Sequence, residues 1–187
     1  MHRRDDGMTL VELLVAITIL GIIGSVVTST LFLALRTSTD AQTTLNESND
    51  RETLALMFTR DAQNAPSVLT TASACMPASS TVIVRFVWFE TQVGVATQAR
   101  REVVYSRPTA AATSITRSIC VGTSAAIGNP VSSTVTRFIS AVSLNCLTSA
   151  YATDATCGVA TRVVRLSVTP SSPGATPFTV DGARRPI

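Results

Sequence analysis

The sequence predicts an α+β protein, with a long N-terminal helix packed on an antiparallel β-sheet domain. No charged residue occurs between Leu13 and Leu35, and no glycine or proline occurs from Arg36 to Ala65. A helix that starts in the apolar run therefore meets no stop signal before Pro66. Beyond that proline, β-branched and aromatic residues gather in short runs, as they do in strands. A helix followed by a series of strands is typical of the α+β class.

The uncharged run, residues 13–35, is long enough to cross a membrane. It has 23 residues, and a helix needs about 20 to span the hydrocarbon. His2, Arg3 and Arg4 precede it, so the positive-inside rule predicts a cytoplasmic N-terminus and an extracytoplasmic head. A cleaved secretory signal would have an apolar core of only about 7–15 residues before a small-x-small site. We therefore expect a retained helix and a single-pass membrane protein.

The second part of the helix, residues 36–65, is polar at first and then amphipathic. Leu54, Phe58, Ala62 and Ala65 recur at helical spacing and form one stripe. Pro66 disfavours helical geometry at the residue before it and so ends the helix. We expect the stripe to pack against the rest of the chain.

The remaining segment, residues 66–187, is predicted to form a β-rich globular head. Turn signals such as Gly128-Asn129-Pro130 and Asp181-Gly182 separate several of its apolar runs. Six strands are expected, at residues 80–90, 101–107, 113–121, 133–147, 160–170 and 177–182.

A short leader, residues 1–7, contains arginine, ends in Gly7 and is followed by Met-Thr-Leu-Val-Glu and the apolar run. This arrangement resembles the class III signal of type IV prepilins and pseudopilins. The resemblance implies that a prepilin peptidase cleaves after Gly7 and then N-methylates Met8. Cleavage there would leave residues 8–35 as the transmembrane or filament-core helix of the mature protein, and Thr9 also fits the family pattern.

Glu12 is the only acidic residue next to the apolar run, and the resemblance gives it a role in assembly. In the family, this glutamate is thought to meet the N-terminal amine of a neighbouring subunit. A carboxylate at membrane depth costs several kcal/mol, and such a pair would neutralise two charges at once. The alternative is that Glu12 is simply hydrated near the cytoplasmic interface. With Thr9, it is the predicted assembly contact.

Details of the sequence favour a minor subunit within this family. The apolar run lacks the proline of many major pilins, which is more like a minor component. Met8 stands where most members have phenylalanine, a position at which other apolar residues also occur. Arg60, Asp61 and Gln63 resemble a motif of J-type minor pseudopilins, although Arg60 and Asp61 could equally be a charge pair on a solvated helix face. The resemblance implies a pilin fold and other pilins as partners. The machine would be a type IV pilus, a competence pilus or a type II secretion system, which places the protein at the cell surface or in a pseudopilus.

The four cysteines all fall on the extracytoplasmic side of the predicted membrane segment, where an even number argues for disulfides. Four cysteines allow three pairings, which the sequence does not distinguish. Our hypothesis pairs Cys146 with Cys157 and Cys75 with Cys120. A zinc site would need close Cys or His spacings. No such spacing occurs, so no metal is predicted.

We predict neither a catalytic site nor a cofactor, because the chain after Gly7 lacks histidine and any phosphate-binding glycine motif. From Pro66 onward there are ten arginines and four acidic residues, a balance of +6. One alternative is therefore a tip subunit whose head contacts DNA or an anionic surface. Another is a single-pass membrane protein unrelated to filaments.

Overall fold

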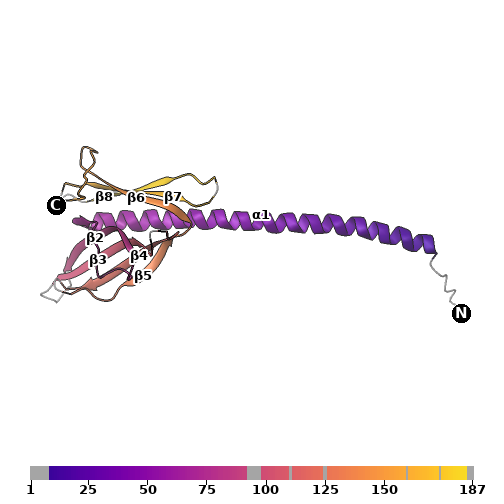
Figure 1. The fold of residues 1–187 in the computed structure, drawn as a ribbon, viewed down its shortest axis with the longest axis horizontal. Coiled ribbons are helices and arrows are strands. Elements are labelled where there is room, and N and C mark those ends of the chain that lie inside the picture. The colour runs from indigo at the N-terminus through magenta and orange to yellow at the C-terminus, as the bar shows by residue number, and fades with distance from the viewer. Residues whose placement is uncertain are drawn as a thin grey trace. The chain divides into compact units, whose positions relative to one another are not determined.

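A computed structural model describes residues 9–91, 98–109, 111–123, 126–158, 160–172 and 174–184. The elements are α1 (Leu10–Asn64), β1 (Ser67–Leu69), β2 (Thr81–Thr91), β3 (Gln98–Arg107), β4 (Ile115–Gly122), β5 (Val131–Thr136), β6 (Ile139–Leu147), β7 (Val163–Pro170) and β8 (Phe178–Ala183) (Figure 1). The chain divides into two units, Met1–Asn46 and Glu47–Ile187. The predicted α+β class is confirmed.

In the first unit, the described residues belong to α1 and its N-terminal cap. Its apolar side chains from Leu10 to Leu35 are exposed on every side of the helix. By length and composition, α1 is the helix of the described residues that could cross a membrane. A helix that is apolar all round needs an apolar environment on all sides, such as lipid or other helices.

The second unit has two antiparallel sheets. The larger has the order β1-β2-β3-β4-β5, and the smaller has the order β6-β7-β8. The part of α1 that belongs to this unit has one sheet on each side, as Figure 1 shows. Phe58 makes edge-to-face contacts with Phe86 of β2 and Tyr105 of β3. On the other side, Ala62 faces Gly182 of β8.

The core of the head forms where the predicted stripe of α1 meets the inner faces of the sheets. Leu54, Phe58, Ala62 and Ala65 are all buried, as the helical spacing predicted. α1 ends at Asn64, directly before the last residue of this stripe. Pro66 follows, and its ring explains why the helix stops there.

One predicted strand was wrong. Residues 133–147 were expected to form a single strand, but β5 and β6 occupy different sheets. The chain turns at Phe138, which has a φ of 55°, in the left-handed region that bulky residues rarely adopt. Asp50 of α1 accepts a hydrogen bond of 2.8 Å from the Arg137 backbone N–H. This contact holds the turn, and nothing in the local sequence signals it.

Candidate functional site

Thr9 and Glu12 close the N-terminal end of α1 as a reciprocal cap. The Glu12 N–H donates to Thr9 Oγ1 at 3.3 Å, and the Thr9 N–H donates to Glu12 Oε2 at 3.3 Å. The Thr9 hydroxyl also lies 3.3 Å from the same Oε2 atom. This is the capping-box arrangement, in which residues at the N-cap and N3 positions satisfy each other's backbone N–H groups. The sequence itself carries the signal for this cap, the spacing Thr-x-x-Glu at residues 9–12.

The cap has a particular value at the end of an apolar helix. The first N–H groups of any helix lack partners within the helix, and an unpaired polar group is costly where water is scarce. Thr9 and Glu12 supply partners from within the same chain. The Glu12 carboxylate therefore has a structural role in addition to any role in assembly.

The apolar part of α1 also satisfies its own side-chain hydroxyl groups. Each serine and threonine between Leu13 and Leu35 donates to a backbone carbonyl three or four residues earlier. These residues are Thr18, Ser25, Thr28, Ser29 and Thr30. Such bonds let hydroxyl groups enter lipid without leaving an unpaired donor. The surface of this segment therefore suits a membrane despite its five hydroxyl groups.

The predicted cleavage residues, Gly7 and Met8, lie outside the described residues. Residues 2–28 match the family model described as the prokaryotic N-terminal methylation motif. The chain carries a prepilin-type N-terminus. Its first residues are thus similar to those of processed type IV pilin-like and pseudopilin proteins, and the apolar helix and head suit a membrane-anchored protein.

This match covers the N-terminal motif and does not extend into the head. A search of curated proteins found no match to the chain. The match therefore does not address the J-type assignment or the minor-subunit role.

The cysteines form two pairs at bonding distance, Cys75–Cys120 and Cys146–Cys157. These are the two pairs that our sequence hypothesis favoured. Their sequence separations are 45 and 11 residues. Loop-closure entropy then predicts about 4 kcal/mol of stabilisation from the first bond and about 3 kcal/mol from the second. The described residues contain no group of three or more potential metal ligands.

Asp154 organises the loop that the shorter disulfide closes. It accepts hydrogen bonds from the Thr161 hydroxyl at 2.6 Å, from the Thr156 hydroxyl and N–H at 2.7 and 3.1 Å, and from the Gly158 N–H at 3.1 Å. These bonds, that of Thr161 above all, lower the pKa of Asp154 to about 2. With its oxygens occupied by protein donors, Asp154 serves the loop itself and leaves little room for a ligand.

Asp61 joins the helix to the larger sheet. It is only 2% exposed, and it accepts two hydrogen bonds of 2.7 Å from the Arg117 guanidinium and one of 2.7 Å from the Tyr105 hydroxyl. Burial, together with the Asp61 charge, raises the pKa of Tyr105 far above its usual range, so its hydroxyl stays a donor. The interpretation of Arg60 and Asp61 as a pair on a solvated helix face is therefore wrong for Asp61.

Arg184 ties the end of α1 to the loop of the shorter disulfide. Its guanidinium donates to the carbonyl groups of Gly158 and Thr161 at 3.0 and 2.8 Å, to that of Ala65 at 3.4 Å, and to that of Pro66. Burial lowers the pKa of Arg184 from its ordinary value, while these carbonyl groups balance its positive charge. No local pattern predicts this clamp, since its members come from three distant segments of the chain.

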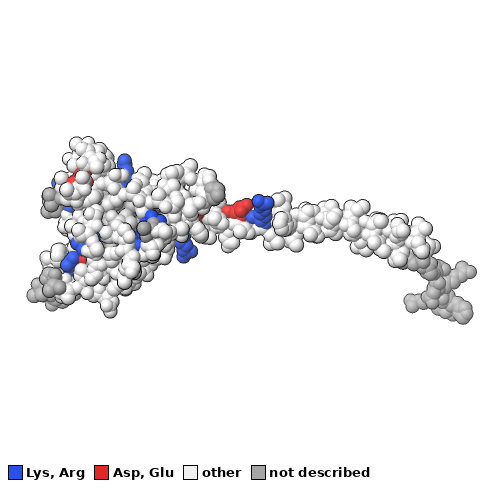
Figure 2. Space-filling model, viewed as in Figure 1, with Lys and Arg blue, Asp and Glu red and all other residues white. Residues whose placement is uncertain are grey.

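Many arginines of the head pair with carboxylates or donate to backbone carbonyls within the head itself. Among the described residues, Arg85, Arg100, Arg101, Arg117 and Arg165 each lie within ion-pair distance of a carboxylate. Two more arginines, Arg107 and Arg184, donate to backbone carbonyls. The basic groups visible in Figure 2 are accordingly scattered over the head. DNA binding stays a prediction, and this pairing weakens it because few of the described arginines of the head remain for a polyanion.

Proposed function

We propose that this chain is a minor subunit of a type IV pilus-like filament or a type II secretion pseudopilus. A prepilin peptidase would cleave it between Gly7 and Met8 and methylate the new N-terminus. The observation that carries the proposal is the methylation motif at residues 2–28, which includes the N-terminal part of the apolar helix α1. The expectation that the protein is not an enzyme is part of this proposal.

Two features of α1 support a role as a filament subunit. Its apolar surface is exposed over the whole circumference of the segment 10–35, which suits transfer from lipid to a bundle of similar helices. Its N-terminal cap satisfies the backbone N–H groups of Thr9 and Glu12 within one chain, so fewer N–H groups need another partner when the end of the helix leaves the interfacial water. A subunit that moves from membrane to filament needs both properties.

Glu12 is proposed to pair with the N-terminal amine of a neighbouring subunit while it caps its own helix. Both hydrogen bonds from Thr9 go to the Oε2 atom of Glu12. The Oε1 atom accepts no bond within the described residues, which leaves it for an intermolecular donor. The two roles of Glu12 are therefore compatible.

The proposal is tested by separating the charge of Glu12 from its capping function. Glu12→Gln keeps a capping-box side chain but removes the charge, whereas Glu12→Ala removes both. We expect both variants to be processed normally, and both to co-purify less with other pilins from detergent-solubilised membranes. Thr9→Ala is the matched control, since it weakens the cap and keeps the carboxylate.

The comparison among these variants decides between charge and cap. If Glu12→Gln co-purifies with partner pilins as well as the wild type does, the proposed charge pair is wrong. A loss confined to Glu12→Ala and Thr9→Ala would assign the effect to the cap alone. The expected order of co-purification is wild type, then Thr9→Ala, then the two Glu12 variants.

A further inference from the structure

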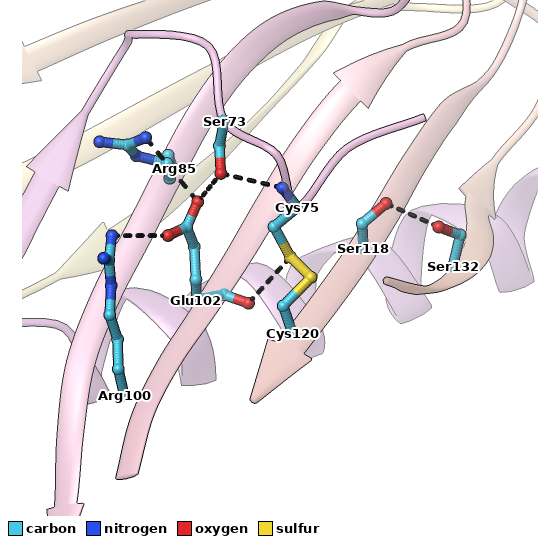
Figure 3. Close-up of a disulfide and its surroundings, with 8 residues drawn as sticks. All are labelled: Ser73, Cys75, Arg85, Arg100, Glu102, Ser118, Cys120 and Ser132. Atoms are coloured by element: carbon cyan, nitrogen blue, oxygen red, sulfur yellow. Dashed lines mark hydrogen bonds and ion pairs between the residues drawn. A yellow bond between two sulfur atoms is a disulfide. The ribbon is translucent and has the colours of Figure 1, made fainter. Parts of the chain in front are cut away.

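A buried carboxylate, Glu102, lies beneath the segment that connects β1 to β2 (Figure 3). Glu102 of β3 is 0% exposed. One of its oxygens lies 2.8 Å from Arg100 Nη2, and the other accepts a hydrogen bond from the Ser73 hydroxyl and lies 3.8 Å from Arg85 Nη1. Burying a charge is costly unless it is paired and hydrogen-bonded. The neighbours of Glu102 meet this requirement. Ser73 belongs to the connecting segment, and Arg85 of β2 donates a hydrogen bond to it.

The same network holds that segment at three close positions, through the backbone of Ala72 and Cys75 and the side chain of Ser73. Ser73 Oγ accepts a hydrogen bond of 3.0 Å from the Cys75 N–H. Arg85 Nη1 donates to the Ala72 carbonyl at 3.1 Å. Residues 72, 73 and 75 are therefore all held by side chains of β2 and β3 or by each other, in a stretch without regular secondary structure.

The partner cysteine is held independently by the sheet. Cys120 of β4 is directly opposite Glu102 in the β3–β4 register. The Sγ atom of Cys75 lies 3.6 Å from the Glu102 carbonyl oxygen, an acceptor that the thiol of the reduced protein could use. The side chain of Glu102 thus contacts Ser73 of the connecting segment, and its backbone carbonyl contacts Cys75. Cys120 lies opposite Glu102 on the neighbouring strand β4.

The geometry points to Glu102 and Ser73 as positioning residues for oxidative folding: they hold Cys75 against Cys120 before the bond forms. They thereby favour this pairing over the two pairings that would join Cys75 to Cys146 or to Cys157. Buried ionic groups are often no more stabilising than apolar ones, and specificity is one reason for a protein to keep them. Here the specificity is the choice of disulfide partner.

The chemistry balances with a glutathione disulfide as oxidant. The thiolate of one cysteine attacks the glutathione disulfide, which forms a mixed disulfide and releases one reduced glutathione. The thiolate of the other cysteine then attacks the protein sulfur and releases the second glutathione. The two protein thiols lose two electrons and two protons in total, and the glutathione disulfide gains them. The positioning residues act on the second step, in which the two protein sulfurs must meet.

The test follows disulfide pairing in the full chain, purified in detergent, reduced in guanidinium and then diluted into oxidised glutathione. Cleavage after arginine places Cys75 in peptide 61–85, Cys120 in peptide 118–137, and the other two cysteines together in peptide 138–162. Native pairing joins the first two peptides and leaves the third as an internal loop. Every incorrect pairing joins peptide 138–162 to another peptide, so mass spectrometry of samples quenched early separates the outcomes.

The decisive variant is Ser73→Ala, which removes the hydroxyl between Glu102 and the Cys75 N–H. We expect the early ratio of native to incorrect linkage to fall about five-fold, the factor that corresponds to one hydrogen bond. Ser132→Ala is the matched control, because Ser132 bonds to Ser118 at 2.8 Å on the strand that carries Cys120 and leaves the connecting segment untouched. Its ratio should equal that of the wild type.

Two results would overturn the inference. One is an equal early ratio in Ser73→Ala, Ser132→Ala and the wild type. The other is a difference that persists when oxidation is carried out in guanidinium, where positioning by folded structure is impossible. Glu102→Gln should change the ratio in the same direction as Ser73→Ala. If that variant does not fold, Ser73→Ala still decides the question.

Discussion

Gly182 of β8 allows the smaller sheet to approach α1, and Gly182→Ala tests that packing directly. A Cβ atom at this position would lie 2.4 Å from the Cβ of Ala62 and 3.3 and 3.4 Å from two ring carbons of Phe58. Carbon atoms pack best at about 3.5–4.0 Å. The strand or the helix would therefore have to move by roughly 1 Å to accept one methyl group.

The expected cost of Gly182→Ala is about 1–3 kcal/mol of unfolding free energy, the range for overpacking in a dense core. Ala62→Gly alone should also destabilise the protein, by about 1 kcal/mol from helix propensity and about 0.8 kcal/mol from the lost buried methyl. The double variant exchanges the two methyl groups and removes the 2.4 Å contact. Its destabilisation should therefore fall short of the sum of the two single values by about 1 kcal/mol or more.

Denaturant unfolding of the full chain in detergent can measure these values through the fluorescence of Trp88, the single tryptophan, which lies in β2 of the head. The reasoning would be refuted if the two substitutions added within about 0.5 kcal/mol, as independent sites do. A Gly182→Ala variant with the same unfolding free energy as the wild type would contradict the close approach of β8 to α1 even more directly.

Two further predictions concern buried and hydrogen-bonded carboxylates of the head. Asp61→Ala should reduce the unfolding free energy by about 3–5 kcal/mol, because it leaves the Arg117 guanidinium buried without its partner; denaturant unfolding that shows less than about 1 kcal/mol would mean that this pair behaves like an exposed one. Asp154 has a pKa of about 2 in the folded head, below its ordinary value of 3.8, so its stabilising effect is complete above pH 3.8 and is lost as the pH falls towards 2. Asp154→Asn should therefore flatten the pH dependence of stability in this window, and an unchanged slope would assign the acid sensitivity to other groups.

The sequence sufficed for features that depend on local patterns. The membrane segment follows from an uncharged run, and the buried stripe from Leu54 to Ala65 follows from helical spacing, because both patterns repeat along one element. The N-terminal motif is equally local. Its capping function could also have been predicted, since Thr9 and Glu12 have the spacing of a capping box.

Features that join distant segments could not be predicted in this way. Asp61 and Arg117 are 56 residues apart in sequence, and many other carboxylates and arginines were equally plausible partners. The break between β5 and β6 depends on Asp50, which accepts a hydrogen bond from the Arg137 N–H. These two residues are 87 positions apart in the sequence. β-branched residues on both sides of the break have the propensity of a continuous strand, so only the tertiary contact shows where the chain turns.

The central claim is that the chain is processed after Gly7, and the mass of the N-terminal peptide from membranes of cells with an active prepilin peptidase tests it most directly. We predict a peptide that begins at Met8 and carries one methyl group on its amine. Gly7→Leu should keep the leader, whereas Gly21→Leu, at a helix glycine with open space around it, should be cleaved as the wild type is. A wild-type chain that begins at Met1, or one that begins beyond residue 35, would contradict the account.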